Sequence, residues 1–300
     1  NARFTIGSIA TKPSKRSPAP PFTTSTLQQE AARKIGFAVG TTMRVAQKLY
    51  EAGLITYMRT DSMNLSDLCL NTVGPVITEL MGADYHQRRR YHTHAKGAQE
   101  AHEAIRPTDM RRSEIKGTAQ EKRLYDLIWK RTVACQMADA QLERTTVLID
   151  VEGSEHHFVA TGEVVKFEGF LRVYRESFED NENESAENLA AEGLLPPMTE
   201  GQDLHRQTIT ARQRYSLPPA RYSEASLVHK LEELGIGRPS TYAPTISTIQ
   251  QREYVRRGEN EGKPRPVTLV TLTGKDIVTE QSSENYGSDR GKLVPTDTGI

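Results

Sequence analysis

The sequence predicts a multidomain α+β protein, with a helical unit inserted into an antiparallel β unit and a second helical unit after it. Three observations predict this class. A chain of 300 residues exceeds the usual size of one domain. Alternating apolar and polar residues, typical of strands, occur near the N-terminus and again over residues 144–213, on both sides of a segment with helical periodicity. Helical periodicity returns after Ser223.

The β unit is expected to be discontinuous. Residues 2–12 alternate as one strand, and the proline-rich segment 13–22 is expected to be a connector. Residues 144–213 contain four strand-like segments separated by turns, and the first strand is expected to complete their sheet. Residues 1–22 and 144–213 would then form one antiparallel domain. The acidic residues 176–187 are interpreted as a solvated loop.

The inserted helical unit is expected to span residues 23–143. Its N-cap candidates and helix-ending glycines are, in order, Thr24, Ser25 or Thr26, then Gly36 and Gly53. The segment LITYMR, residues 54–59, is expected to be a short strand after the second helix.

The second helical unit repeats this order within residues 214–300. A helix ends at Gly235, another helix runs from about Thr241 to Arg252, and a strand begins near residue 254. The repeat predicts two winged helix-turn-helix-like units, and two unrelated helical hairpins are the alternative. No path is predicted for residues 257–300.

The overall composition excludes several classes of protein. The 39 basic and 39 acidic residues cancel, so any surface for nucleic acid must be local. Cys69 and Cys135 are the only cysteines, and without a CxxC pair they support neither a disulfide framework nor a cysteine zinc site. No apolar run approaches the roughly 20 residues that cross a bilayer, so we expect a cytoplasmic protein with no membrane partner.

The segment YEAGLITYMRTDS, residues 50–62, is the strongest candidate for chemistry. If it is extended, Tyr57, Arg59 and Asp61 share one face. A free tyrosine has a pKa of about 10 and is mostly protonated at neutral pH. A nearby arginine favours the phenolate and can equally stabilise charge building on a phosphate. The alternative is a half-buried packing tyrosine with its hydroxyl in water.

Two further segments indicate phosphate binding. In QEAHEAIRPTD, residues 99–109, a helix ended by Pro107 would place His102 and Arg106 on one face, where they could grip a phosphate. The alternative is a surface histidine beside a capped helix end, and the arginine rules out an HExxH zinc site. In GIGRPSTYA, residues 235–243, a helix precedes the glycines, which argues against a dinucleotide fold.

The glycine segment is instead expected to bind a backbone phosphate at a helix N-terminus. Arg238, Ser240 and Thr241 would form this cradle, and ordinary N-capping by the same hydroxyls is the alternative. The basic stretch QRRRYHTHAK, residues 87–96, is expected either to follow a DNA backbone or to be a solvated loop. His92 and His94 have no third metal ligand nearby.

Four segments resemble those of bacterial topoisomerase I, a type IA DNA topoisomerase, and occur in that family's order. Together they span roughly residues 20–256: PPFTTSTLQQEA, LYEAGLITYMRTDS, QEAHEAIRPTD and RYSEASLVHKLEELGIGRPSTYAPTISTIQ. The resemblance implies the central domains of a toroidal protein that holds DNA, with winged-helix modules. It also implies transient cleavage of single-stranded DNA through a 5′-phosphotyrosine link, which relaxes negative supercoils without ATP.

The resemblance also implies roles for individual residues. Tyr57 would be the nucleophile, Arg59 would stabilise the phosphate, and Glu51 and His102 would support the cleavage site. The implied DNA contacts are Arg238, Ser240, Thr241, Thr60, Asp61 and Arg106.

The family's Mg²⁺ ligands belong to a Toprim domain with a DxDxE cluster, and these 300 residues contain no DxDxE. We therefore expect a core fragment that lacks the Toprim domain, binds no metal itself and acts as a monomer. On its own it is expected to bind single-stranded DNA weakly without relaxing plasmids. The alternatives are a non-catalytic winged-helix DNA-binding protein and a structural clamp subunit.

Overall fold

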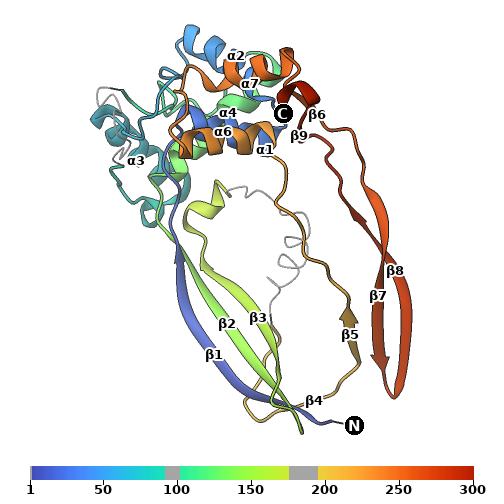
Figure 1. Cartoon of the computed structure of the whole chain (residues 1–300). Helices are drawn as coiled ribbons and strands as arrows, with labels where there is room; N and C mark the ends of the chain where they lie inside the picture. The colour runs from blue at the N-terminus through green and yellow to red at the C-terminus, as the bar shows by residue number, and fades with distance from the viewer. Residues whose placement is uncertain (1, 92–101, 176–194) are drawn as a thin grey trace.

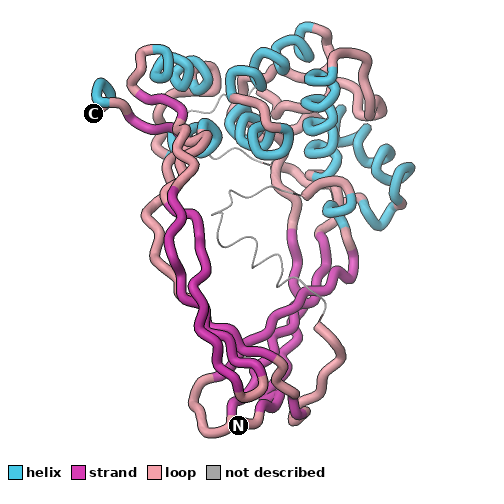
Figure 2. The backbone as a smooth tube through the Cα atoms, turned by 90° about the vertical axis from the view of Figure 1, so that its right-hand side faces the viewer, coloured by secondary structure: helices cyan, strands magenta, loops and turns pink. Residues whose placement is uncertain are grey.

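The computed structural model describes residues 2–91, 102–175 and 195–300. Its elements follow one another around a ring. The helices gather at one end, and two long β arms run from them to the opposite end, where the N-terminus lies (Figure 1). The view turned by 90° shows the same two arms converging near the N-terminus (Figure 2). The helical units and the β arms are therefore distinct parts of the molecule.

The first β arm is a four-stranded antiparallel sheet in the order β3-β2-β1-β4. Its strands are β1 (Phe4–Arg16), β2 (Ala140–Val151), β3 (His157–Phe167) and β4 (Asp203–Leu204). The N-terminal strand thus pairs with strands that follow the helical block, which confirms that prediction. The prediction that the strand ends at residue 12 is wrong. The strand continues through Pro13 to Arg16. Proline has no backbone N–H to donate, but β4 pairs only with the start of β1, so at Pro13 that side of β1 is a free edge where no N–H is needed.

The second β arm contains β5 (Thr208–Arg212), β7 (Lys263–Thr273) and β8 (Asp276–Tyr286), in the order β5-β7-β8. The hairpin β7–β8 lies in the part of the sequence for which no path was predicted. Residues 170–178 are the third of the four strand-like segments expected within residues 144–213. This prediction is wrong at the start of the segment, because the 3₁₀ turn η2 (Gly169–Arg172) takes its place. The acidic loop predicted at 176–187 lies outside the described residues.

The first helical unit contains α1 (Thr24–Ile35), α2 (Val39–Glu51), α3 (Asp67–Met81), the 3₁₀ turn η1 (Ala83–Tyr85) and α4 (Ala119–Ala134). These helices enclose the largest buried apolar cluster, which includes Leu27, Leu49, Val73 and Ile128. Gly36 ends α1 with a φ of 67°, as predicted. The N-cap is Thr23, and not one of the three residues predicted, because the Thr24 hydroxyl is engaged with the loop at residues 58–60.

The second helical unit contains α6 (Glu224–Glu233), α7 (Tyr242–Gln251), the paired strands β6 (Val255–Arg257) and β9 (Leu293–Pro295), and η3 (Asp297–Gly299). The two units touch, with α1 against α6 and α2 against α7. Val39 of α2 is fully buried in the small core of the second unit, beside Val228, Tyr242 and Ile246. No helix in the described parts of the chain is long and apolar enough to span a bilayer.

Candidate functional site

The tyrosine loop, residues 54–62, carries the predicted nucleophile. The prediction of a strand here is wrong, since only Ile55 bridges to another segment, at Pro107. The side chains still alternate. The Tyr57 side chain is 42% exposed and Arg59 is exposed, whereas Met58 and Thr60 are buried. Tyr57 and Arg59 therefore share the solvent face of a loop whose other face is anchored in the core.

One anchor of the loop is Thr56. Its N–H donates to the carbonyl of Arg106 at 2.9 Å, and its hydroxyl donates to the carbonyl of Ala104 at 2.7 Å. The Arg106 N–H returns a bond to the Thr56 hydroxyl at 2.9 Å. These bonds fix the residue before Tyr57 from both backbone and side chain.

The other anchor is Thr24, at the start of α1. Its hydroxyl donates to the Met58 carbonyl at 2.8 Å and accepts from the Thr60 N–H at 2.8 Å. Its own N–H donates to the Thr60 carbonyl at 2.8 Å. Since Met58 and Thr60 flank Arg59, these bonds bracket the arginine. Thr60 is 2% exposed, so the structure gives it a structural contact with α1 and does not support the predicted contact with DNA.

Two rings surround the Tyr57 phenol. The Tyr50 ring, from the last turn of α2, lies 5.3 Å away between centroids at 68°, and the His102 ring lies 6.5 Å away at 69°. The structure thus places the His102 ring beside that of Tyr57. Neither the Tyr57 hydroxyl nor the Arg59 guanidinium makes a hydrogen bond or ion pair with another described residue. Both groups face solvent and are available to a ligand.

Glu51 follows Tyr50 at the end of α2 and is exposed. Its Oε1 accepts a hydrogen bond from Gln47 at 2.7 Å, and no contact with Tyr57 is present between these described residues. Asp61 is half-buried on the same loop as Tyr57.

The prediction of a helix that ends at Pro107 is wrong for its described part, residues 102–107, which are extended. They are held by backbone bridges from Ile105 to Phe22 and from Pro107 to Ile55. Residues 99–101 of this segment lie outside the described residues. His102 and Arg106 therefore do not share a helix face.

Arg106 is also not free to grip a phosphate. It is 7% exposed, and its guanidinium donates to both oxygens of Glu103, at 2.9 and 2.7 Å. Further bonds reach the Pro107 carbonyl at 2.8 Å and the Ser66 hydroxyl at 3.2 Å. Burial on its own would raise the pKa of Glu103, but the hydrogen bonds from Arg106 and Ser66 outweigh it and lower that pKa. Arg106 is part of the scaffold under the tyrosine loop.

The cradle loop, residues 235–241, connects α6 to α7. Gly235 and Gly237 have φ values of 67° and 85°, which only glycine adopts without strain. The Arg238 N–H donates to the Thr241 hydroxyl at 2.8 Å. That hydroxyl therefore closes the loop and makes no capping bond to α7, which leaves the helix N-terminus without a side-chain cap. Arg238, Ser240 and Thr241 are all exposed.

The cradle loop lies near the tyrosine loop in space. Burial raises the pKa of the Tyr242 phenol at the start of α7, and the carboxylates of Glu232 and Asp61 raise it further by unfavourable interaction with the phenolate. Asp61 belongs to the tyrosine loop. The carboxylate of Asp61 therefore acts electrostatically on a phenol at the N-terminus of α7.

Comparison with known proteins agrees with this geometry. A sequence model of the family described as DNA topoisomerase matches residues 1–299. The chain belongs to the DNA topoisomerase family. It is 42% identical over 315 residues to "DNA topoisomerase 1 type prokaryotic" of Acanthamoeba polyphaga mimivirus, and 50% identical over 263 residues to DNA topoisomerase 1 of Streptomyces coelicolor. These alignments cover 100% and 85% of the chain but 37% and 27% of the two relatives.

A solved structure supports the same topoisomerase fold. Full-length topoisomerase I from Thermotoga maritima matches with a TM-score of 0.70 and 32% identity, over 86% of this chain and 42% of that one. The predicted type IA fold class is thereby confirmed. The chain spans about a fifth to two fifths of the length of the topoisomerases that it matches.

The basic stretch of this topoisomerase chain is partly paired with carboxylates where it is described. The guanidinium groups of Arg88 and Arg90 pair with Asp67, and that of Arg89 pairs with Asp139. Three guanidinium groups thus share two carboxylates and keep a net positive charge, and a path for DNA along residues 87–91 stays a prediction. His92 and His94 lie outside the described residues.

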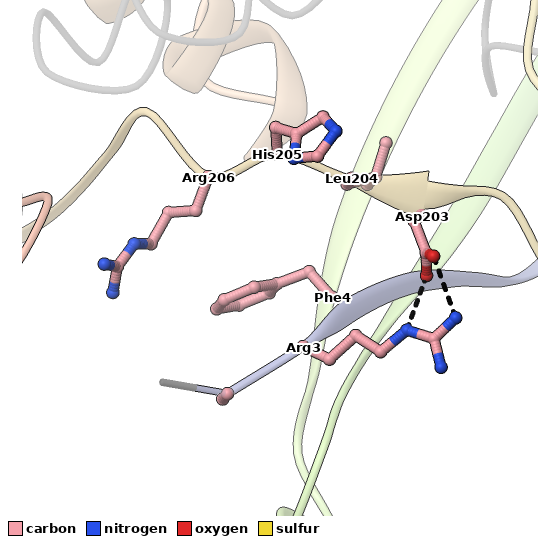
Figure 3. Close-up of a pocket in the computed structure, with 7 residues that line it drawn as sticks. Arg3, Phe4, Asp203, Leu204, His205 and Arg206 are labelled. Atoms are coloured by element: carbon pink, nitrogen blue, oxygen red, sulfur yellow. Dashed lines mark hydrogen bonds and ion pairs between the residues drawn. The ribbon is translucent and has the colours of Figure 1, made fainter.

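A cavity of about 310 Å³ lies far from the tyrosine loop, at the N-terminal end of the β arms, and is lined by residues 2–4 and 203–206. There the Arg3 guanidinium donates to both oxygens of Asp203, at 2.7 and 2.8 Å, and so ties β1 to β4 (Figure 3). No three His, Cys, Asp or Glu side chains converge as a metal site within the described ranges. The described residues therefore do not form a Mg²⁺ site.

Proposed function

We propose that this chain carries the nucleophile of a reaction that breaks and rejoins single-stranded DNA. The Tyr57 hydroxyl attacks the phosphorus of a phosphodiester and loses its proton. The bond from phosphorus to the 3′ oxygen breaks, and that oxygen leaves as a 3′ hydroxyl. The new 5′-phosphotyrosine ester keeps the bond energy, so the 3′ hydroxyl can reverse the attack without ATP. The exposed phenol on a doubly anchored loop carries this proposal, two residues from a guanidinium that has no partner among the described residues.

Each neighbouring group has a proposed role that its position supports. Arg59 stabilises the charge that builds on the attacked phosphate, because its guanidinium has no partner among the described residues. His102 supports the cleavage site beside the Tyr57 ring, and exposed Glu51 acts at its margin. Asp61, half-buried on the same loop as Tyr57, is proposed to contact the bound strand.

Arg238, Ser240 and Thr241 are proposed to hold a backbone phosphate. Three features support this: their exposure, the uncapped N-terminus of α7 and the positive end of its helix dipole. The chain has no net charge, so its DNA contact depends on such local groups.

In the whole protein we propose relaxation of negatively supercoiled DNA by a monomer in the cytoplasm, with Mg²⁺ held by a Toprim domain outside these residues. The names of the relatives support the reaction, and the short share of their length that this chain spans is consistent with ligands supplied elsewhere. When bound, Mg²⁺ would supply positive charge near the phosphate.

The test uses the intact protein that carries this chain. It is mixed with labelled single-stranded DNA and stopped with SDS, which traps a covalent adduct on a gel. We expect an adduct that disappears in Tyr57→Phe. Tyr50→Phe is the matched control, since its ring lies 5.3 Å from that of Tyr57, and its adduct should remain. An adduct that survives Tyr57→Phe, or a wild-type protein that binds DNA without forming one, would show a different nucleophile or a non-catalytic DNA-binding protein.

A further inference from the structure

The two loops proposed to contact DNA belong to different helical units. One hydrogen bond joins the start of α2 to the start of α6, from the Val39 N–H to Glu224 at 3.1 Å, and a second joins α1 to the end of α6 beside the cradle loop. The Ser25 hydroxyl, in the first turn of α1, donates to Oε2 of Glu232, in the last turn of α6, over 2.6 Å. This length is typical of a hydroxyl bonded to a charged carboxylate, a strong class of hydrogen bond. The residues are 207 positions apart in the sequence.

On the α1 side, one peptide bond separates Ser25 from Thr24, the residue that anchors the tyrosine loop. Ser25 follows Thr24, whose hydroxyl and N–H hold the backbone of Met58 and Thr60. Those two residues flank Arg59. A shift of the first turn of α1 therefore moves Arg59, and Tyr57 with it.

On the α6 side, the same turn carries the cradle loop. The carbonyl of Glu232 accepts from the Gly235 N–H at 3.0 Å, and the carbonyl of Leu231 accepts from the Ile236 N–H at 2.8 Å. The side chain of Glu232 thus holds α1 while its backbone holds the start of the loop with Arg238.

The contact is buried and supported on the Ser25 side, whereas Glu232 is exposed. Ser25 is 1% exposed, and its oxygen also accepts from the Gln29 side chain at 3.0 Å, so its hydroxyl is held in the direction of Glu232. A carboxylate in the last turn of a helix is opposed by the helix dipole, so helix stability does not explain Glu232. Its neighbour Glu233 is paired with Lys230 at 3.0 Å and does not bond to α1.

We propose that Glu232, acting through Ser25, is a positioning residue that sets the tyrosine loop against the cradle loop during DNA cleavage. The inference rests on the function proposed above and adds to it. If a phosphate is held by the cradle loop, the reach of Tyr57 to a scissile phosphorus on the same strand depends on this joint. Loss of the bond should slow the attack without removing any side chain that contacts DNA.

The experiment uses the intact protein with a labelled single-stranded oligonucleotide. The rate of adduct formation is measured at saturating DNA, and DNA affinity is measured separately in a Tyr57→Phe background. Glu232→Ala should form the adduct about tenfold more slowly, the effect of one lost charge-assisted hydrogen bond, with affinity within about twofold of wild type. Glu232→Gln keeps an oxygen acceptor and should recover to within about threefold.

Glu233→Ala is the matched control, because it removes the same charge from the same turn without touching Ser25, and it should react like wild type. Ser25→Ala should match Glu232→Ala, and the double variant should lose nothing more. A wild-type rate in Glu232→Ala would overturn the proposal, as would an equal loss in Glu233→Ala or a loss confined to affinity. If Ser25→Ala fails to fold, the three glutamate variants decide alone.

Failure of the proposed DNA cleavage by Tyr57 would give a different result from failure of the positioning role alone. In that case wild type forms no adduct, or the adduct persists in Tyr57→Phe, and the positioning role falls with it. A wild-type adduct that depends on Tyr57, combined with an unaffected Glu232→Ala, removes only the positioning role.

Discussion

Replacing Thr24 with valine should loosen the tyrosine loop without changing the shape of the core. The hydroxyl of Thr24 is fully buried, donates to the Met58 carbonyl and accepts from the N–H of buried Thr60. Valine leaves that N–H and that carbonyl without this partner. A buried polar group without a partner costs about 1–3 kcal/mol, so the two together should cost about 2–6 kcal/mol.

Hydrogen exchange of the Thr60 amide is the suitable assay, because it reports opening of the loop without requiring the whole multidomain chain to unfold in one step. At about 1.4 kcal/mol per factor of ten, Thr24→Val should exchange this amide about 30 to 20,000 times faster than wild type.

Thr24→Ser is the control. It keeps the hydroxyl and removes one methyl group, which should cost only about 0.5–1.5 kcal/mol. Equal exchange of the Thr60 amide in the valine and serine variants would refute the reasoning, because the hydroxyl would then not be what holds the loop.

Three further outcomes follow from buried groups. The lowered pKa of Glu103 means that its stabilisation is present above its unfolded pKa of about 4.3 and is lost as the pH falls through the lower folded pKa. Urea midpoints of wild type and Glu103→Gln should therefore converge on acidification from pH 7 to about 3, and parallel curves would contradict this. Burial raises the pKa of Cys69 to about 11 and that of Cys135 to about 12. Iodoacetamide at pH 8 should therefore label these thiols only after denaturation. Labelling of the native chain would count against their burial. Val39→Ala should destabilise the second helical unit by about 1–3 kcal/mol. Proteolysis within α6–α7 should then be faster. An unchanged proteolysis rate would mean that Val39 does not stabilise that core.

Periodic features could be predicted from the sequence because their causes are local. The N-terminal strand joined the sheet as expected, and Gly36 ended α1 because a left-handed residue is needed there. The exposure of Tyr57 and Arg59 against buried Met58 also followed from alternation, although the segment is a loop and not a strand. Alternation requires only an extended backbone, and here side-chain hydroxyls replace a neighbouring strand.

Other features depend on contacts between distant residues. The spacing of His102 and Arg106 suits a helix, but bridges from Phe22 and Ile55 hold the segment extended. The arginine then turns to Glu103, which the sequence did not single out. The hairpin β7–β8 escaped prediction because β8 is almost entirely exposed and has no apolar face.

The contacts that hold the site were also missed. Thr24 looked like one of several N-cap candidates, and nothing near Ser25 in the sequence indicates Glu232. The candidate nucleophile and cradle could be located by motif, whereas the joint between them required the structure.

The attachment point of the adduct tests the central claim most directly. A single-stranded oligonucleotide is labelled at either its 5′ or its 3′ end, trapped with SDS and digested to peptides for mass spectrometry. A 5′-phosphotyrosine link predicts that only the 3′ label stays with the protein and that the modified peptide carries its nucleotide on Tyr57. A retained 5′ label, or a nucleotide on Tyr50 or any other residue, would contradict the account.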